Sequence, residues 1–382
     1  MIVEIRKAGF INKGAELMLH AILQKVKEEF PSAQLAMAPS ADNGSAPYAK
    51  RAELGFLQKP NLWQYGVQWG DLAGLVPKKT REMYGVILNR EVDIVLDAAG
   101  FAYSEQLGAR SSVELARSCK RWKKNKTRVV LLPQAMGPFT SKKIKDAIRT
   151  VAAHADLIFA RERISYDHLV SVAGERPNIR IAPDFTNLIE GELPESFDAI
   201  NNRFCLVPNY RMIDMTPKKQ SEAYLPFMIK CANYLLEKDL KPFILVHEGA
   251  NDFMLAEKIR DAAGECIRIV KESHPVKIKG ILGACDGIIS SRFHGLVSAL
   301  CQGIPSLGTG WSHKYRMLFE DYGFSDGLID VTMGEEELRQ KIDLITVSPK
   351  KTAIRNLILA KSNEQKTLSS EMWDNVFKVL RS

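Results

Sequence analysis

The stretch that decides the fold is residues 287–308, GIISSRFHGLVSALCQGIPSLG. It opens with GIIS, a short apolar run that predicts a buried strand, and it closes with PSLG, which predicts another. The residues between these two runs, 294–302, predict a helix. Because neighbouring parallel strands need a crossover, usually a helix, this pattern indicates one unit of a parallel sheet.

The same alternation extends outward along the chain in both directions. Strands are predicted at 2–7, 33–39, 93–100, 128–139, 156–162 and 179–185, and then at 204–210, 242–248, 267–272, 287–290 and 305–308. Helices are predicted at about 14–30, 112–124, 141–154, 220–237, 251–263, 278–284, 294–302, 313–321 and 351–380, and a further helix follows the strand at 156–162 and runs through Leu169. Apolar strands that alternate with helices form parallel sheets covered on both faces. We therefore expect an α/β protein of two Rossmann-like domains whose parallel sheets face a central cleft.

The length and one polar segment suggest where the two domains meet. The chain has 382 residues, which favours two domains over a single core. Residues 190–203, EGELPESFDAINNR, are polar and contain Pro and Gly, so they are the predicted linker. This linker separates an N-terminal domain (1–190) from a C-terminal domain (200–345). The last predicted helix, within 350–382, is expected to pack back on the N-terminal domain.

The composition excludes several classes of protein. No apolar stretch is long enough to span a bilayer, and the N-terminus, MIVEIRKAGF, lacks the apolar core of a signal peptide. We therefore expect a cytoplasmic protein. The six cysteines form no CxxC pair and have no zinc-ligand spacing, so scattered, mostly buried thiols are expected, and no metal site.

The net charge of +8 and the pI of about 9.0 suit an anionic partner. The sequence contains no DNA- or RNA-binding motif, so we expect no nucleic acid. The densest basic run, KRWKK at 120–124, ends a predicted helix and complements the negative end of the helix dipole there. The alternative is that this run contacts anionic lipid or a lipid-linked pyrophosphate, which would place the protein at the inner face of the membrane.

Candidate functional residues lie where the strands end, because ligands of open parallel sheets bind beyond the carboxyl ends of the strands. After the strand at 287–290, Ser291 is followed by Arg292, His294 and Gly295. Arg292 is suited to grip a carboxylate or phosphate, and His294 to exchange a proton near neutral pH. A helix that begins at Gly295 would add backbone N–H groups for an anion. The alternative is structural: Arg292 pairs with a surface carboxylate and His294 caps the helix.

Four more candidates occupy comparable positions. Lys314 follows the strand at 305–308, and Asn12 follows the first strand, where it is suited to cap the next helix. Arg161 and Asp184 end two further strands of the first half. Taken singly, each of these residues is more often part of a turn, an ion pair or a cap.

Taken in order, the strand-end motifs resemble the polysaccharide pyruvyl transferase family. The matching pieces are GxxNxGAE at 9–16, PQAMGPF at 133–139, RERxS at 161–165, APD at 182–184, SSRFHG at 290–295, GIP at 303–305 and HKY at 313–315. They span roughly residues 3–330. Where family members often have GQGIGP, this chain has LPQAMGP at 132–138, a departure that bears on the acceptor more than on the chemistry.

The resemblance implies the twin-domain architecture of glycosyltransferases, with the acceptor on the N-terminal domain and the donor on the C-terminal domain. It implies phosphoenolpyruvate as the donor of a pyruvyl group. The acceptor would be a sugar of a surface polysaccharide or of its lipid-linked precursor. The product would be a ketal, formed with release of phosphate and without a cofactor or metal. The residues that the resemblance places at the site are His294 and Arg292 as catalytic groups, and Lys314, Gly295, Ser291, Arg161, Asn12 and Asp184 as substrate-binding groups.

Two other functions remain open on the sequence. One is a glycosyltransferase that uses a nucleotide sugar, with Glu248 as the candidate ligand for the ribose. Fold alone does not separate this function from the first. The other is a non-catalytic subunit of a polysaccharide assembly system, against which the presence of Arg292, His294 and Lys314 argues.

Overall fold

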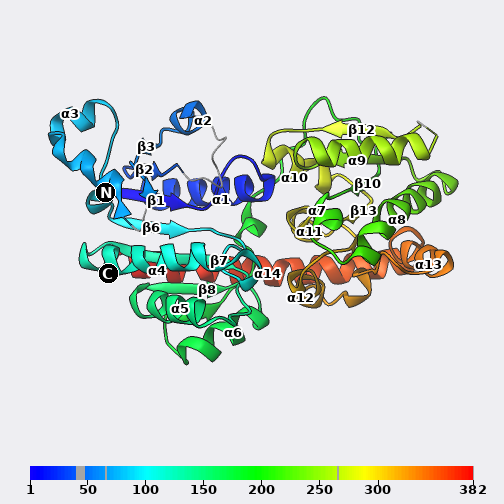
Figure 1. The fold of residues 1–382 in the computed structure, drawn as a ribbon. Coiled ribbons are helices and arrows are strands. Elements are labelled where there is room, and N and C mark those ends of the chain that lie inside the picture. The colour runs from blue at the N-terminus through cyan, green and yellow to red at the C-terminus, as the bar shows by residue number, and fades with distance from the viewer. Residues whose placement is uncertain (40–47, 65–66, 265, 382) are drawn as a thin grey trace. The chain divides into compact units, whose positions relative to one another are not determined.

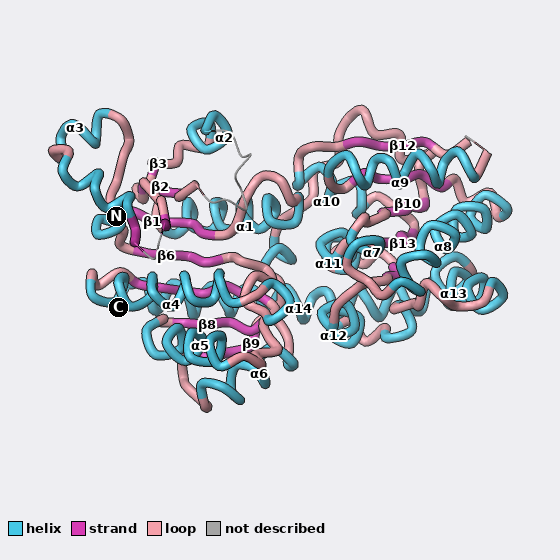
Figure 2. Tube along the Cα trace, viewed as in Figure 1, coloured by secondary structure: helices cyan, strands magenta, loops and turns pink. Residues whose placement is uncertain are grey.

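The computed structural model describes residues 1–39, 48–64, 67–264 and 266–381 (Figure 1). The contacts between Cα atoms divide the chain into two compact units. Unit 1 comprises Met1–Ile11, Met18–Phe185 and Ser369–Ser382, and unit 2 comprises Asn12–Leu17 and Thr186–Leu368. Each unit is built around one main parallel sheet, and Figure 2 shows the strands of each sheet flanked by helices. The expected α/β class, with two parallel-sheet domains, is therefore confirmed.

Unit 1 contains a seven-stranded sheet in the order β3-β2-β1-β6-β7-β8-β9, with every neighbouring pair parallel. Its strands are β1 (Ile2–Arg6), β2 (Gln34–Met37), β3 (Leu57–Gln58), β6 (Ile94–Asp97), β7 (Arg128–Gln134), β8 (Leu157–Ala160) and β9 (Ile179–Ile181). Its main helices are α1 (Lys13–Glu29), whose first residues belong to unit 2, and α4 (Ala109–Lys124), α5 (Lys142–His154) and α6 (Arg163–Ala173). Every residue of β6 and β8 is buried, as expected for parallel strands covered by helices on both faces.

The segment between β2 and β6 carries smaller elements. They are α2 (Tyr48–Glu53), the antiparallel pair β4 (Trp63–Gln64) and β5 (Val67–Gln68), the 3-10 helices η2 (Trp69–Leu75) and η3 (Asn89–Glu91), and α3 (Lys78–Met83). The sequence does not predict these elements, because each is too short to show a clear helical or strand period.

Unit 2 contains a five-stranded parallel sheet in the order β12-β11-β10-β13-β14. Its strands are β10 (Phe204–Val207), β11 (Pro242–Val246), β12 (Arg268–Lys271), β13 (Gly287–Ser290) and β14 (Ser306–Gly308). Its helices are α7 (Arg211–Asp214), α8 (Lys218–Glu237), α9 (Gly249–Ala262), α10 (Pro275–Gly283), α11 (Phe293–Leu300), α12 (His313–Asp321) and α13 (Glu335–Thr346). All residues of the three central strands are buried, as their apolar sequences predict.

The longest of the helices that were not predicted is α13. Its buried residues Leu338, Ile342 and Ile345 recur at a spacing of four and three, which is the helical period. Three glutamates in its first turn, Glu335–Glu337, are also a helix-start signal, because negative charge is favourable at a helix N-terminus. The signal was therefore present in the sequence.

The C-terminal helix, α14 (Lys350–Arg381), contributes residues to both units, with the division after Leu368. In unit 2, Ser362 donates a hydrogen bond of 2.6 Å to the carbonyl oxygen of Cys301. In unit 1, the ring of Trp373 packs edge-on against Phe185 at 5.8 Å between centroids. Among the described residues, no helix has the length and apolarity that a membrane crossing requires.

Candidate functional site

The loop after β13 turns sharply into α11, and two serines shape it. The hydroxyl of Ser290 accepts a hydrogen bond of 3.1 Å from the backbone N–H of Arg292. Arg292 is the N-cap, so the helix begins at Phe293 and not at Gly295 as expected. Gly295 lies one turn into the helix, where an added Cβ would be 2.9 Å from the hydroxyl of Ser290. Gly295 therefore keeps the loop close to the helix that follows it.

Ser291 faces the interior of unit 2. Its side chain is fully buried, and its hydroxyl accepts a hydrogen bond of 2.8 Å from the hydroxyl of Tyr224. Its carbonyl oxygen accepts hydrogen bonds from the amide of Asn209 at 2.8 Å and from the hydroxyl of Tyr315 at 3.0 Å. Sequence reasoning missed Tyr224 and Asn209, which come from other parts of unit 2. Together these contacts hold the backbone that presents Arg292.

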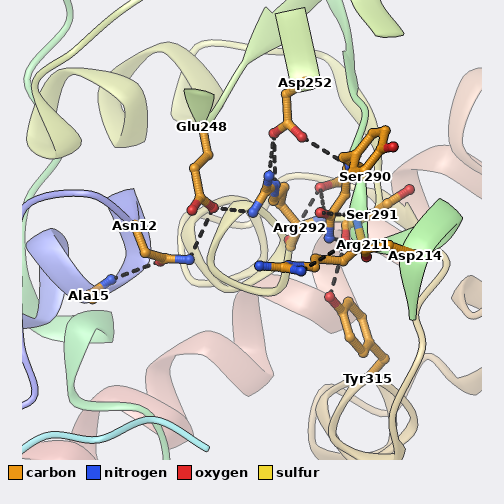
Figure 3. Close-up of polar contacts among 12 residues, drawn as sticks. Asn12, Ala15, Arg211, Asp214, Glu248, Asp252, Ser290, Ser291, Arg292 and Tyr315 are labelled. Atoms are coloured by element: carbon orange, nitrogen blue, oxygen red, sulfur yellow. Dashed lines mark hydrogen bonds and ion pairs between the residues drawn. The ribbon is translucent and has the colours of Figure 1, made fainter. Parts of the chain in front are cut away.

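Arg292 lies between two carboxylates (Figure 3). Its Nε donates to Asp252 at 2.9 Å, and its terminal nitrogens contact both Asp252 and Glu248. Glu248 is the N-cap of α9 and Asp252 lies in the first turn of that helix. The amide of Asn12 donates a further hydrogen bond of 3.0 Å to Glu248. The structural alternative for Arg292 was an ion pair with a surface carboxylate. Arg292 does pair with carboxylates, but one of them, Asp252, is completely buried.

Burial dominates the electrostatics around this ion pair. It raises the pKa of both Glu248 and Asp252, and the positive charge of Arg292 opposes that rise. Burial also holds the pKa of His247 well below its ordinary value, and the charge of Arg292 adds to this effect. His247 is therefore neutral near pH 7. An anion that approaches Arg292 competes with two carboxylates whose ionised forms burial disfavours.

His294 lies in the first turn of α11, against the start of α1. The side-chain oxygen of Asn12 accepts a hydrogen bond of 3.1 Å from the backbone N–H of Ala15, which confirms the predicted cap. A Cβ added to Gly14 would lie 2.1 Å from Nδ1 of His294. The ring of His294 also meets the ring of Phe293 edge-on, at 5.5 Å and 87°. Only glycine at position 14 leaves room for the imidazole.

Lys314 lies among aromatic rings at the start of α12. Its Nζ is 5.0 Å from the ring of Phe293, 5.1 Å from that of Trp311 and 5.6 Å from that of Tyr315. Contacts between a cation and an aromatic face contribute about 0.5–2 kcal/mol each, depending on desolvation. Because Phe293 also contacts His294, the ring links the predicted His294 and Lys314 on two different helices.

Arg161 and Asp184 belong to unit 1. Arg161 directly follows β8, and its Nη1 is 3.3 Å from a carboxylate oxygen of Asp184. Both residues are buried, and the backbone carbonyl of Asp184 accepts a hydrogen bond of 3.3 Å from Ser369 of α14. The eight predicted site residues thus form two groups: Asn12, Ser291, Arg292, His294, Gly295 and Lys314 in unit 2, and Arg161 with Asp184 in unit 1.

The described part of the chain contains no group of three or more His, Cys, Asp or Glu side chains placed to hold a metal ion. The nearest candidate in the sequence, His247 with Glu248 and Asp252, contributes its two carboxylates to Arg292 instead. The chemistry of the unit 2 group is therefore that of fixed cations, an imidazole and a helix N-terminus. Such groups bind and polarise anions.

Several solved structures have a fold similar to that of this chain. Structures similar to this chain include HepE of Anabaena in complex with UDP and glucose, at 12% identity and a TM-score of 0.59, covering 100% of this chain and 99% of that one. Another is UDP-GlcNAc 2-epimerase of Neisseria meningitidis bound to UDP-GlcNAc, at 9% identity and a TM-score of 0.60, with the same coverage. At these identities the likeness shows the fold alone. A comparison of the sequence with curated proteins gives no match.

The family model for polysaccharide pyruvyl transferase matches residues 12–313. The matched range begins at Asn12, includes the loop after β13 and ends at His313, directly before Lys314. It covers most of the chain and almost every strand-end motif described above. The chain therefore belongs to the polysaccharide pyruvyl transferase family.

Proposed function

We propose that the protein transfers a pyruvyl group from phosphoenolpyruvate to a sugar of a surface polysaccharide or of its precursor. The observation that carries this proposal is the grouping of Arg292, His294 and Lys314 in unit 2, around Phe293 and the N-terminus of α11. Phosphoenolpyruvate carries about three negative charges when its phosphate is fully ionised. Two fixed cations and a helix N-terminus are the groups that such a donor needs.

The reaction requires one proton at carbon and two new C–O bonds. A proton adds to the methylene carbon of phosphoenolpyruvate, and the neighbouring carbon becomes cationic. One sugar hydroxyl attacks that carbon, phosphate leaves with its bonding electrons, and a second hydroxyl closes the ketal. Of the two hydroxyl protons, one balances the proton now in the methyl group and the other leaves with phosphate. His294 is the proposed group for proton transfer to or from the substrates.

The remaining predicted residues take supporting roles in this proposal. Asn12 fixes Glu248, and Glu248 in turn contacts Arg292, so Asn12 acts through its neighbours. Ser291 and Gly295 shape the loop that presents Arg292. Arg161 and Asp184, both in unit 1, are proposed on the acceptor side.

Calorimetric titration with phosphoenolpyruvate tests the donor assignment directly. We expect the wild type to bind phosphoenolpyruvate, and Arg292→Lys to bind it about 10–100-fold more weakly, because hydrogen bonds to charged groups contribute about 1.5–3 kcal/mol. Lysine keeps the charge between Glu248 and Asp252, so this variant should stay folded. Arg203→Lys, at an exposed ion pair with Asp286, is the matched control and should bind normally. Wild-type affinity in Arg292→Lys would remove Arg292 from the donor site.

A nucleotide-sugar glycosyltransferase is the second candidate function, since the similar structures named above contain UDP or a UDP sugar. The structure gives one argument against it in this chain. Glu248, the candidate ribose ligand, already contacts Asn12 and Arg292. The same titration with UDP-glucose separates the two functions: binding of UDP-glucose without any response to phosphoenolpyruvate would favour the glycosyltransferase.

We also propose a peripheral contact of unit 1 with anionic lipid. Three large side chains here are strongly exposed. Leu75 at the end of η2 is 84% exposed, Met83 at the end of α3 is 77% exposed, and Tyr84 directly after α3 is 72% exposed. α3 lies at the periphery of unit 1 (Figure 1). Arg121 of α4 pairs with Asp71 of η2 at 2.9 Å, which brings the basic run 120–124 beside this apolar surface. Aromatic and aliphatic side chains flanked by lysines are typical of proteins that lie in the membrane interface.

Vesicle flotation measures this contact. The wild type should float with vesicles that contain phosphatidylglycerol and much less with phosphatidylcholine alone. Leu75→Asp should reduce the bound fraction about tenfold or more, because burying one leucine side chain contributes about 1.5–3 kcal/mol. Ile200→Asp, at a side chain that is 77% exposed in unit 2, should float like the wild type. An equal loss of vesicle binding in Leu75→Asp and Ile200→Asp would show that the exposed apolar side chains of η2 and α3 have no special role in this contact.

A further inference from the structure

Arg292 lies between two carboxylates, so this cluster carries an excess of one negative charge when both are ionised (Figure 3). Phosphoenolpyruvate is itself an anion, and a donor bound at Arg292 lies beside Glu248 and Asp252. Because a nearby negative charge disfavours the ionised form of a carboxyl group, donor binding favours a proton on one of the two carboxylates. Their hydrogen bonds indicate which one receives it.

Both oxygens of Asp252 are already in use. Its Oδ1 accepts a hydrogen bond of 2.9 Å from the backbone N–H of Tyr210, and its Oδ2 accepts one of 2.9 Å from Nε of Arg292. Asp252 is also completely buried, so a substrate does not reach it. Because hydrogen bonds to a carboxylate favour its ionised form, Asp252 is the fixed counter-ion of Arg292.

Glu248 keeps one oxygen available. Its side chain makes two hydrogen bonds to other described residues, from Asn12 at 3.0 Å and from Arg292, and both end at Oε2. The side chain is 21% exposed, so Oε1 can take a proton and present it to a ligand beside Arg292. Burial raises the pKa of Glu248, which brings its protonated form closer to neutral pH, as in other carboxyl groups that act as acids.

Other charged or titratable groups also face Glu248 or line the same cavity wall: Asp252, Arg211 of α7, Lys13 of α1, His247, and Lys271 and Glu272 at the end of β12. Arg292 and Arg211 favour the ionised form of Glu248, whereas Asp252 disfavours it. The neutral His247 adds no charge. A bound anion offsets the charge of Arg292 and leaves burial and Asp252, which both favour protonation of Glu248.

We propose that Glu248 is the general acid: it takes up a proton when phosphoenolpyruvate binds at Arg292 and donates that proton to the methylene carbon. The inference rests on the proposed function and assigns its two kinds of proton transfer to two residues. The electron pair of the C=C bond forms the new C–H bond, and Glu248 is left as a carboxylate. The attacking hydroxyl gives its proton to His294, which passes it to solvent after phosphate leaves. Glu248 takes up its next proton with the next donor.

Calorimetric titration with phosphoenolpyruvate in Hepes and in Tris at the same pH measures the proton uptake, because the buffers differ in their heat of ionisation. We expect the wild type to take up about one proton more per donor than Glu248→Gln. Glutamine keeps an oxygen that accepts from Asn12 and Arg292, and Glu248 makes no side-chain cap in α9, so this variant should stay folded. Glu237→Gln, at the surface pair with Arg339, is the matched control.

Two further readouts separate an acid from a merely structural residue. Glu248→Gln should bind phosphoenolpyruvate at least as tightly as the wild type, because it removes a negative charge beside Arg292, yet release phosphate about 10²–10⁴-fold more slowly. Because uptake of a proton on binding weakens binding as the pH rises, wild-type affinity should fall by up to about tenfold per pH unit more steeply than that of Glu248→Gln. Glu237→Gln should match the wild type in every measurement.

The outcomes separate this inference from the proposed function. Equal proton uptake in the wild type and in Glu248→Gln, or normal phosphate release in that variant, would overturn the general acid and leave the pyruvyl donor standing. A parallel loss of donor affinity and turnover would overturn it as well, because Glu248 would then only position Arg292. A wild type that ignores phosphoenolpyruvate would reject the proposed function and the general acid together.

Discussion

Replacing His294 with alanine is expected to lower kcat by about 10²–10⁴-fold, the usual contribution of a general acid or base. The dissociation constant for phosphoenolpyruvate should change only a few fold, because Arg292, Lys314 and the N-terminus of α11 remain in place. The expected difference between turnover and binding follows from the geometry. The imidazole lies beside the Arg292 loop and packs against Phe293 and Gly14. The measurement is steady-state phosphate release together with calorimetry.

A second variant tests the same imidazole without replacing His294 itself. Gly14→Ala should lower kcat in the same direction, because its Cβ would lie 2.1 Å from Nδ1 of His294 and the ring would have to move. His154→Ala is the control, since that histidine lies in the last turn of α5 in unit 1. Turnover in His294→Ala equal to that of the wild type would exclude His294 from the proton transfer.

Replacing Lys59 with methionine is expected to destabilise unit 1 by about 3–5 kcal/mol, the cost of leaving one charge of a buried ion pair alone. Nζ of Lys59 is 2.5 Å from a carboxylate oxygen of Glu4 on β1, and both side chains are almost fully buried. Nζ also donates to Asn89 at 3.2 Å and lies 5.8 Å from the ring of Trp122. Burial lowers the pKa of Lys59 and Glu4 opposes that shift, so the pair depends on both charges.

Urea unfolding of three variants distinguishes a paired charge from simple packing. The double variant Glu4→Leu/Lys59→Met should recover most of the loss, because replacing both charges with apolar groups removes the desolvation cost of each. Lys78→Met at the exposed pair with Glu82, 3.7 Å apart, should change the free energy of unfolding by less than about 1 kcal/mol. If the double variant were as unstable as Lys59→Met, the ion pair would not be the source of the effect.

Much of the site's location follows from local sequence. The apolar runs that become β13 and β14 end directly before Ser291 and shortly before Lys314, and Asn12 caps α1 as its sequence indicates. Strand and helix periods extend over several residues of one segment, so they can be recognised without knowledge of the rest of the chain. The order of the strand-end motifs along the chain also indicates the family, because that order is a property of the sequence alone.

The partners of Arg292 cannot be inferred from the residues near it in the sequence. Asp252 and Glu248 are 40 and 44 residues away in sequence, and nothing near Arg292 indicates which carboxylates it meets. The same holds for Tyr224, which is 67 residues from Ser291. Parallel strands bring such positions together only after the crossover helices have packed, because each helix inserts many residues between neighbouring strand ends.

By itself, the sequence determined the α/β class, most of the strands and helices, and the strand ends that carry Asn12, Arg292, His294 and Lys314. These features depend on the period of apolar side chains and on turn residues, which act over a few neighbours. Only the tertiary structure decided that two buried carboxylates hold Arg292, that Gly14 makes room for His294, and that the hydrogen bonds of Glu248 to Asn12 and Arg292 end at one oxygen. Those features depend on contacts between side chains far apart in the chain, and packing sets them through burial and distance.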